Sequence, residues 1–221
     1  MATVLSPPEQ RVILENIPWD TYERILEAHR NCSAPRFTYD RGRLEIMSPS
    51  AKHEELRDLI VQLVGAIAEG VDVDMRSFGS TTFRREDFER GFEPDGCFYI
   101  QSVDRISKGE VELDLTIDPP PDLVIEIDIT SPSIRKLPIF AQMGVPEVWR
   151  CDGRRWSILT LEASGEFVKQ NESRALPGVT AEVIERFLDE SFRVRRPEWL
   201  RSVREWARQL GGSLYNDSDG T

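Results

Sequence analysis

Apolar residues recur with a helical period in two long segments of the chain. Between residues 50 and 69 they stand at positions 56, 59, 60, 63, 64 and 67, which line one face of an α-helix. Ser48 and Pro49 precede this segment, and serine followed by proline is typical of a helix start, so we expect Ser48 to cap it. A second stripe, formed by Trp199, Val203, Trp206 and Leu210, predicts a helix over about 197–210.

Shorter apolar runs bounded by glycine or proline predict strands, and the whole order of elements is that of a mixed α/β fold. Further helices are expected near 21–30, 133–143 and 180–190. Residues 1–20 are predicted to be a loose leader that docks through Ile13, Leu14, Ile17 and Trp19, and the tail 211–221 to be frayed. The predicted strands are RFTYD, RLEIMS, short strands within 71–100, DLVIEIDI, PEVWRCD and RRWSILTL. We expect a single domain over residues 1–221.

The strand DLVIEIDIT separates its side chains into two different faces. Positions 123, 125, 127 and 129 carry only leucine or isoleucine, whereas Glu126 and Asp128 stand side by side on the other face. Two carboxylates two residues apart repel each other strongly unless water or a cation lies against them. One interpretation is an antiparallel strand with a solvated face. The other is a metal site, because Mg²⁺ prefers oxygen ligands and usually takes one or two protein carboxylates.

A second carboxylate and a cation are available for such a site. Asp95 follows Pro94 at the start of a predicted strand and could join Glu126 from a neighbouring strand. Arg135 and Lys136 follow Glu126 by nine and ten positions, and the long lysine stem could reach back over the polar face. Hydrolysis of a phosphodiester needs such a positive group near the phosphate. We therefore expect the Asp95 and Glu126 head groups to converge, with Lys136 nearby.

These residues resemble a known nuclease motif. Pro94-Asp95, then Glu126-Ile127-Asp128, with a lysine displaced downstream, is similar to a variant of the PD-(D/E)XK motif. The strings GSTTFRRED, GFEPDGCFYI, DLVIEIDITSPS and KLPIFAQMGVPEVWR resemble a large bacterial family of restriction-endonuclease-like proteins, formerly a domain of unknown function. The resemblance covers roughly residues 35–160.

The resemblance implies a restriction-endonuclease-like core over about 35–165, with a central mixed β-sheet flanked by helices and a C-terminal helical segment over about 179–210. It also implies cleavage of DNA that depends on Mg²⁺ or Mn²⁺. Asp95 and Glu126 would be metal ligands and Lys136 would take the role of the displaced lysine. Asp128 stands where the superfamily has its lysine, and in this resemblance it would be a ligand or a support. Glu54, in the first turn of the long helix, would join the metal ligands; the alternative is that it only favours the helix dipole.

Composition narrows the class of protein further. The formal net charge of −11 argues against a nucleic-acid coat protein but not against an enzyme that gathers carboxylates around a cation. No apolar run approaches the ~20 residues of a membrane span. The three cysteines show no CxxC spacing, and the amino end shows no export signal, so we expect a cytoplasmic protein.

A homodimer would suit paired cuts on a duplex. The alternative function is a catalytically inactive nuclease-fold module that acts in protein–protein or nucleic-acid interaction.

Overall fold

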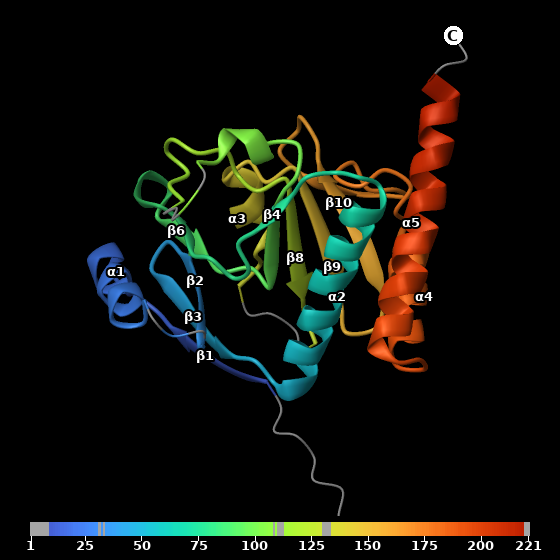
Figure 1. Cartoon of the computed structure of the whole chain (residues 1–221). Helices are drawn as coiled ribbons and strands as arrows, with labels where there is room; N and C mark the ends of the chain where they lie inside the picture. The colour runs from blue at the N-terminus through green and yellow to red at the C-terminus, as the bar shows by residue number, and fades with distance from the viewer. Residues whose placement is uncertain are drawn as a thin grey trace, which may run out of the picture.

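The computed structural model describes residues 9–30, 32, 34–107, 109, 113–129 and 134–218 of the chain. Its strands form two sheets, a smaller antiparallel one of five strands and a larger one of six (Figure 1). The smaller sheet has the order β1 (Gln10–Leu14), β3 (Arg43–Ser48), β2 (Arg36–Asp40), β6 (Arg90–Phe92) and β5 (Phe83–Arg85). The larger has the order β11 (Phe167–Gln170), β10 (Trp156–Leu161), β9 (Glu147–Cys151), β8 (Leu123–Ile127), β7 (Gly96–Tyr99) and β4 (Arg76–Ser77).

The larger sheet is mixed. β8 pairs in parallel with β9 and antiparallel with β7, so the prediction of a central mixed sheet flanked by helices is confirmed. The separate smaller sheet was not expected. Part of the segment predicted to be a loose leader is instead β1, which pairs antiparallel with β3 from Gln10 opposite Ser48 to Leu14 opposite Leu44.

The helix α2 (Ala51–Gly70) lies along one face of the larger sheet. Its apolar stripe packs against Leu123, Ile125 and Ile127 of β8, which confirms the predicted apolar face of that strand. Two further helices, α4 (Ala181–Ser191) and α5 (Arg196–Ser218), pack against α2 and complete this core. Trp199 and Val203 of the predicted C-terminal stripe are fully buried in it.

The helix α2 begins two residues later than expected. Its cap is Ser50, whose hydroxyl accepts a hydrogen bond from the His53 amide at 3.2 Å. Ser48 cannot be the cap because it is still the last residue of β3, in extended pairing with Gln10. The pair that resembles a helix start in the sequence is therefore the end of a strand.

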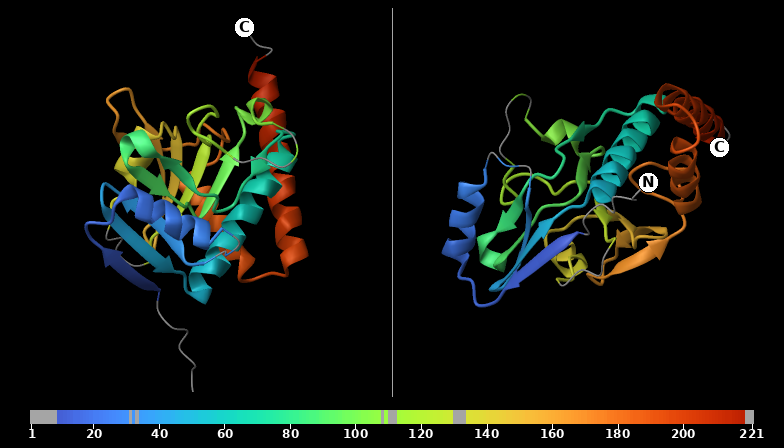
Figure 2. Two further views of the ribbon diagram at one scale, coloured as in Figure 1. Left: turned by 90° about the vertical axis from the view of Figure 1, so that its left-hand side faces the viewer. Right: turned by 90° about the horizontal axis from the view of Figure 1, so that it is seen from below.

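The opposite face of the larger sheet is covered by a short helix, α3 (Leu137–Gln142), and by the smaller sheet. Phe140 of α3 contacts Phe92 of β6, with ring centroids 4.7 Å apart. On the outer side of the smaller sheet lies α1 (Trp19–Ala28), away from α2 (Figure 2). Tyr22 of α1 stacks on Tyr39 of β2 at 4.6 Å. The smaller sheet is thus held between two helices and borders the polar face of β8.

The C-terminal helix is longer than predicted. α5 continues to Ser218, so residues 211–218 of the segment expected to fray are helical, and residues 219–221 lie outside the described part. The predicted helical segment at 133–143 is shorter, since α3 begins at Leu137 and residues 130–133 are not described. No helix in the described ranges combines the length and apolar content needed to cross a bilayer.

Candidate active site

Asp95 is held beside Glu126 by two hydrogen bonds to β8. It directly precedes β7, its amide donates to the Ile125 carbonyl at 3.1 Å, and its Oδ2 accepts from the Ile127 amide at 2.6 Å. These partners flank Glu126 on both sides along the strand. The structure therefore places Asp95 against the strand segment that carries Glu126, and these are two of the three residues that the sequence predicted as metal ligands.

The polar face of β8 is buried. Glu126 is 3% exposed and Asp128 is 5% exposed, so the interpretation as a solvated strand face is wrong. Each carboxylate has a cation instead. Lys136, just before α3, reaches back to form an ion pair with Glu126 Oε1, and Arg150 Nε of β9 donates to Asp128 Oδ2 at 2.7 Å. Buried charges are tolerated when they are paired in this way.

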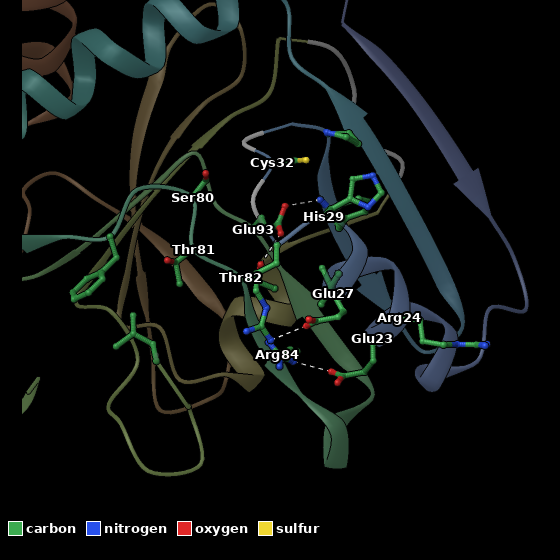
Figure 3. A pocket seen from close by; sticks show the side chains of 16 residues that line it. Glu23, Arg24, Glu27, His29, Cys32, Ser80, Thr81, Thr82, Arg84 and Glu93 are labelled. Carbon is green, nitrogen blue, oxygen red and sulfur yellow. Dashed lines mark hydrogen bonds and ion pairs between the residues drawn. The ribbon is translucent and has the colours of Figure 1, made fainter. Parts of the chain in front are cut away.

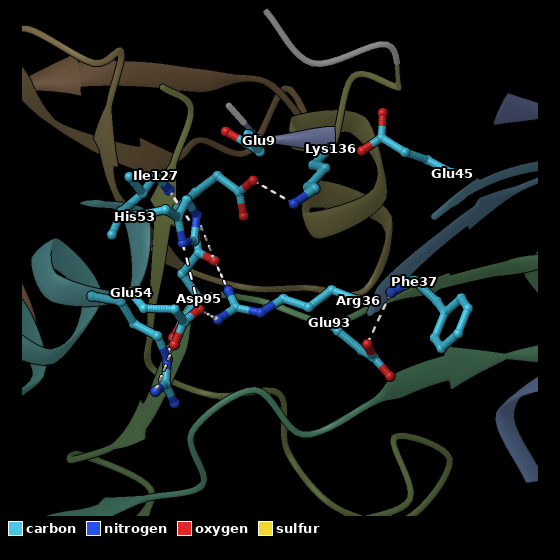
Figure 4. A network of polar contacts seen from close by, with 12 residues as sticks. Glu9, Arg36, Phe37, Glu45, His53, Glu54, Glu93, Asp95, Ile127 and Lys136 are labelled. Atoms are coloured by element: carbon cyan, nitrogen blue, oxygen red, sulfur yellow. Dashed lines mark hydrogen bonds and ion pairs between the residues drawn. The ribbon is translucent and has the colours of Figure 1, made fainter. Parts of the chain in front are cut away.

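Asp95 has its own cation, which comes from the smaller sheet. Arg36 of β2 forms an ion pair with Asp95 Oδ1, and its other terminal nitrogen donates to Glu54 Oε1 at 2.6 Å (Figure 4). His53 of α2 is fully buried, and its Nε2 lies 3.2 Å from Asp95 Oδ1. The site thus combines residues from both sheets and from the first turn of α2.

Glu54 lies at the edge of this network. Its side chain is 42% exposed and shares Arg36 with Asp95. The adjacent His53 side chain is the main cause that holds the pKa of Glu54 below its usual range; burial opposes it, and the charges of Arg36 and Arg57 add to the lowering. Glu54 is therefore ionised and close to the other carboxylates, but one of its oxygens is already engaged by a guanidinium.

The charge state of Glu126 depends on its neighbours. Burial raises the pKa of Glu126, the nearby Lys136 opposes this effect, and the Asp128 carboxylate adds to it. Lys136 therefore favours the ionised carboxylate, whereas burial and Asp128 favour the protonated one. Lys136 is itself only 7% exposed, so the two charges depend on each other.

Among the described residues of the site, two buried carboxylate oxygens have neither a hydrogen bond nor an ion pair, and a comparison with Glu147 shows how unusual this is. Glu126 Oε2 and Asp128 Oδ1 accept no hydrogen bond from any residue in the described ranges. Glu147 of β9 is equally buried, yet both of its oxygens are occupied. Its donors are Trp149 Nε1, Ser173 Oγ, Arg174 N and Ala175 N. Glu147 therefore has a structural role, whereas Glu126 and Asp128 retain acceptor capacity.

The donor set fits a hard divalent cation by type. Carboxylate oxygens are the ligands that Mg²⁺ and Mn²⁺ favour, and unfilled ones are present on Glu126 and Asp128. Within the part of the chain that the structure describes, however, no three His, Cys, Asp or Glu side chains are gathered closely enough to hold an ion. Arg36, rather than another carboxylate, occupies the space against Asp95 Oδ1.

A cavity of about 490 Å³ opens beside these groups. Its lining contains two acids and three cations, together with apolar side chains of α3. The lining residues are Glu126, Asp128, Arg135, Lys136, Leu137, Pro138, Phe140 and Arg150. The volume and the excess of positive groups suit a small anionic group such as a phosphate.

A larger cavity of about 910 Å³ lies between α1 and the smaller sheet (Figure 3). Its charged groups are engaged with one another or with the backbone. Arg84 pairs with Glu23 at 2.7 Å, and Glu93 accepts from Thr82 Oγ1 at 2.6 Å and from the Phe37 amide at 2.9 Å. We therefore place the candidate chemistry in the smaller cavity.

Comparison with known families agrees with this geometry. Residues 19–188 match the model of the Uma2 family, which is described as "Putative restriction endonuclease". The chain belongs to the Uma2 family. The resemblance seen in the sequence strings is thereby confirmed, and the matched range contains all five candidate site residues.

A solved structure supports the fold of this Uma2 chain. It is the crystal structure of "a putative nuclease belonging to DUF820" from Anabaena variabilis, with a TM-score of 0.53 and 15% sequence identity. The similarity covers 83% of this chain and 99% of the other. At that identity it shows a shared nuclease-like fold. A search of curated proteins gave no match.

Three site residues of the Uma2 chain were missed by sequence reasoning. Arg36 opens a strand with no chemical pattern around it, and only the docking of the two sheets brings it to Asp95. Arg150 reaches the site because β9 pairs in parallel with β8, with Arg150 opposite Glu126. His53 gave a signal, since it continues the apolar stripe of α2, but the stripe indicates burial and not its contact with Asp95.

Proposed function

We propose that this Uma2 protein is a metal-dependent endonuclease that hydrolyses phosphodiester bonds of DNA, with Mg²⁺ or Mn²⁺ as its cofactor. The observation that carries the proposal is the environment of Glu126. This carboxylate is buried, lines a cavity, has Lys136 on one oxygen and an unfilled second oxygen, and stands beside Asp95.

Each residue has a role in this proposal. Asp95 and Glu126 would hold the metal ion, with Glu54 at the edge of the site and Asp128 as a further ligand or a support. A bound ion would lower the pKa of a coordinated water and polarise the phosphate. Lys136 lines the cavity, and its ammonium group would stabilise the negative charge that develops on the phosphate during attack.

Cleavage of supercoiled and linear DNA in the presence of Mg²⁺ or Mn²⁺ tests the proposal. We expect Glu126→Gln to lower the cleavage rate by more than about 100-fold, because it removes a metal ligand and the partner of Lys136. The control is Glu166→Gln, which makes the same chemical change at an exposed position in the turn between β10 and β11. A wild type of high purity that cuts no DNA, or a Glu126→Gln variant as active as the control, would refute the proposal.

A second candidate function is supported by the contacts of Asp95. One of its oxygens forms an ion pair with Arg36 and the other accepts a hydrogen bond from the Ile127 amide, so its charge is balanced by a protein cation without a metal. This arrangement favours a catalytically inactive nuclease-fold module that acts through protein–protein or nucleic-acid contacts. Titration of Mn²⁺ by calorimetry separates the two functions. An enzyme binds the ion and loses affinity in Asp95→Asn, whereas an inactive module gives no binding heat in either protein.

A further inference from the structure

Arg150 projects from β9 into the same cavity as Glu126 and Lys136. In the parallel pairing of β8 and β9 it lies opposite Glu126, and its Nε donates to Asp128 Oδ2 at 2.7 Å. The Arg150 side chain is 34% exposed, whereas Asp128 is 5% exposed. Asp128 is fixed in turn by its amide, which donates to the Cys151 carbonyl at 2.8 Å. The guanidinium is therefore anchored through Nε, in a side chain that lines the cavity and stays partly exposed.

The outer end of Arg150 is available to a ligand. Its two terminal nitrogens donate to no acceptor among the residues that the structure describes. A guanidinium with two parallel N–H donors free matches two oxygens of a phosphate group. The charges of the cavity agree with such a ligand. The charge of Lys136 balances that of Glu126, and the charge of Arg150 balances that of Asp128. The exposed Arg135 leaves the cavity lining with one net positive charge, which complements the single negative charge of a phosphodiester.

We propose that Arg150 binds a backbone phosphate of DNA and that Asp128 is the positioning residue that holds its guanidinium toward the cavity. The inference rests on the proposed function and adds a substrate contact to it. It also gives a role to the acid that replaces the in-strand lysine: Asp128, directly after β8, provides the anchoring carboxylate, and Arg150 of the neighbouring strand β9 provides the cation.

Binding of a fluorescein-labelled DNA duplex in EDTA, followed by anisotropy over a range of KCl concentrations, tests the contact without any cleavage. Arg150→Gln keeps a donor for Asp128, so the buried carboxylate stays hydrogen-bonded and the variant is expected to fold. We expect about tenfold weaker binding, because a charge-assisted contact is lost. The slope of log Kd against log salt should fall by about 0.9. Arg150→Lys should keep the slope and lose only a few-fold in affinity.

The matched control is Arg154→Gln, which removes the same charge from an exposed position in the turn that follows β9. It should leave affinity and slope unchanged. If Arg150→Gln behaves like this control, or if both variants lose equally, the inference is overturned even when the wild type binds and cuts DNA. A wild type that neither binds nor cuts DNA overturns the proposed function as well. Thermal melts of each variant show whether it is folded.

The role of Asp128 is tested by the direction of its effect. Simple charge counting predicts that Asp128→Leu tightens DNA binding, because a negative charge is removed. If Asp128 positions Arg150, Asp128→Leu weakens DNA binding several-fold. Asp128→Asn restores the binding, since its side-chain oxygen still accepts a hydrogen bond from Arg150 Nε. In the Arg150→Gln background, Asp128→Leu causes no further weakening. Tighter binding of Asp128→Leu than of the wild type would refute the positioning role.

Discussion

The ion pair between Lys136 and Glu126 should be strongly coupled in folding stability. With the two residues 7% and 3% exposed, removal of one partner leaves a buried charge without compensation. Such a loss typically costs about 3–5 kcal/mol, whereas replacing both charges together is often close to neutral. We expect Lys136→Met and Glu126→Gln each to lower the free energy of unfolding by about 3 kcal/mol, and the double variant to lie within about 1 kcal/mol of the wild type.

Urea denaturation of the four proteins measures this coupling. The exposed pair Arg195–Glu198, at 3.7 Å and with side chains 80% and 46% exposed, serves as the control. Glu198→Gln should cost less than about 0.5 kcal/mol. If the losses from the two single substitutions are additive, or if Lys136→Met costs no more than Glu198→Gln, the buried charges are not coupled.

The effect of Lys136→Met should also depend on pH. Burial raises the pKa of Glu126 above its ordinary value of 4.5, and Lys136 opposes that shift. Without the lysine, folded Glu126 keeps its proton to a higher pH than the unfolded chain does. The variant should therefore be least destabilised at low pH and lose stability as the pH rises through the folded pKa.

Two further predictions concern helix packing and a second buried acid. A Cβ at Gly70 would lie 2.4 Å from the Ala207 Cβ of α5, so Gly70→Ala should lower the free energy of unfolding by about 1–3 kcal/mol. At Gly65 the nearest atom to an added Cβ is Met75 Cε at 3.8 Å, so Gly65→Ala should stabilise α2 by about 0.5–1 kcal/mol. Thermal melts in which both variants shift in the same direction would contradict this packing. Burial raises the pKa of Glu93 above its ordinary value of 4.5, so this group reduces stability as the pH rises through the folded pKa. In Glu93→Gln that part of the pH dependence should disappear from the urea midpoints, and an unchanged profile would argue against it.

Periodicity predicted the elements that bury one face. The stripe of α2 and the alternation of β8 follow from periods of 3.6 and 2 residues, and each apolar face meets the other in the core. The pairing of strands was less accessible, since β1 joins β3 through contacts some thirty to forty residues apart that no local pattern specifies. Ser48 was misread because capping chemistry is local, whereas the end of β3 is set by pairing with β1.

In the candidate site too, residues next to a local pattern were predictable and residues brought in by strand pairing were not. Asp95, Glu126 and Lys136 could be found from the sequence because they stand next to recognisable strings and because two carboxylates on one strand face need a cation. Arg36 and Arg150 could not, since each arrives through a strand from elsewhere in the chain. The acids of the site were therefore predictable, whereas only one of the three cations that neutralise them was.

The guanidinium of Arg36 comes from β2 of the smaller sheet, and the carboxylate that it neutralises is on Asp95, directly before β7 of the larger sheet. The seam between the two sheets, where Arg36 meets Asp95, is therefore held partly by an ion pair. A small rotation of one sheet against the other would change the distance between these two charges. A shortened relative without the smaller sheet would keep Asp95 and Glu126 but would lose this balance. Variation in length should accordingly be confined to turns far from the seam, such as the one that connects β10 with β11.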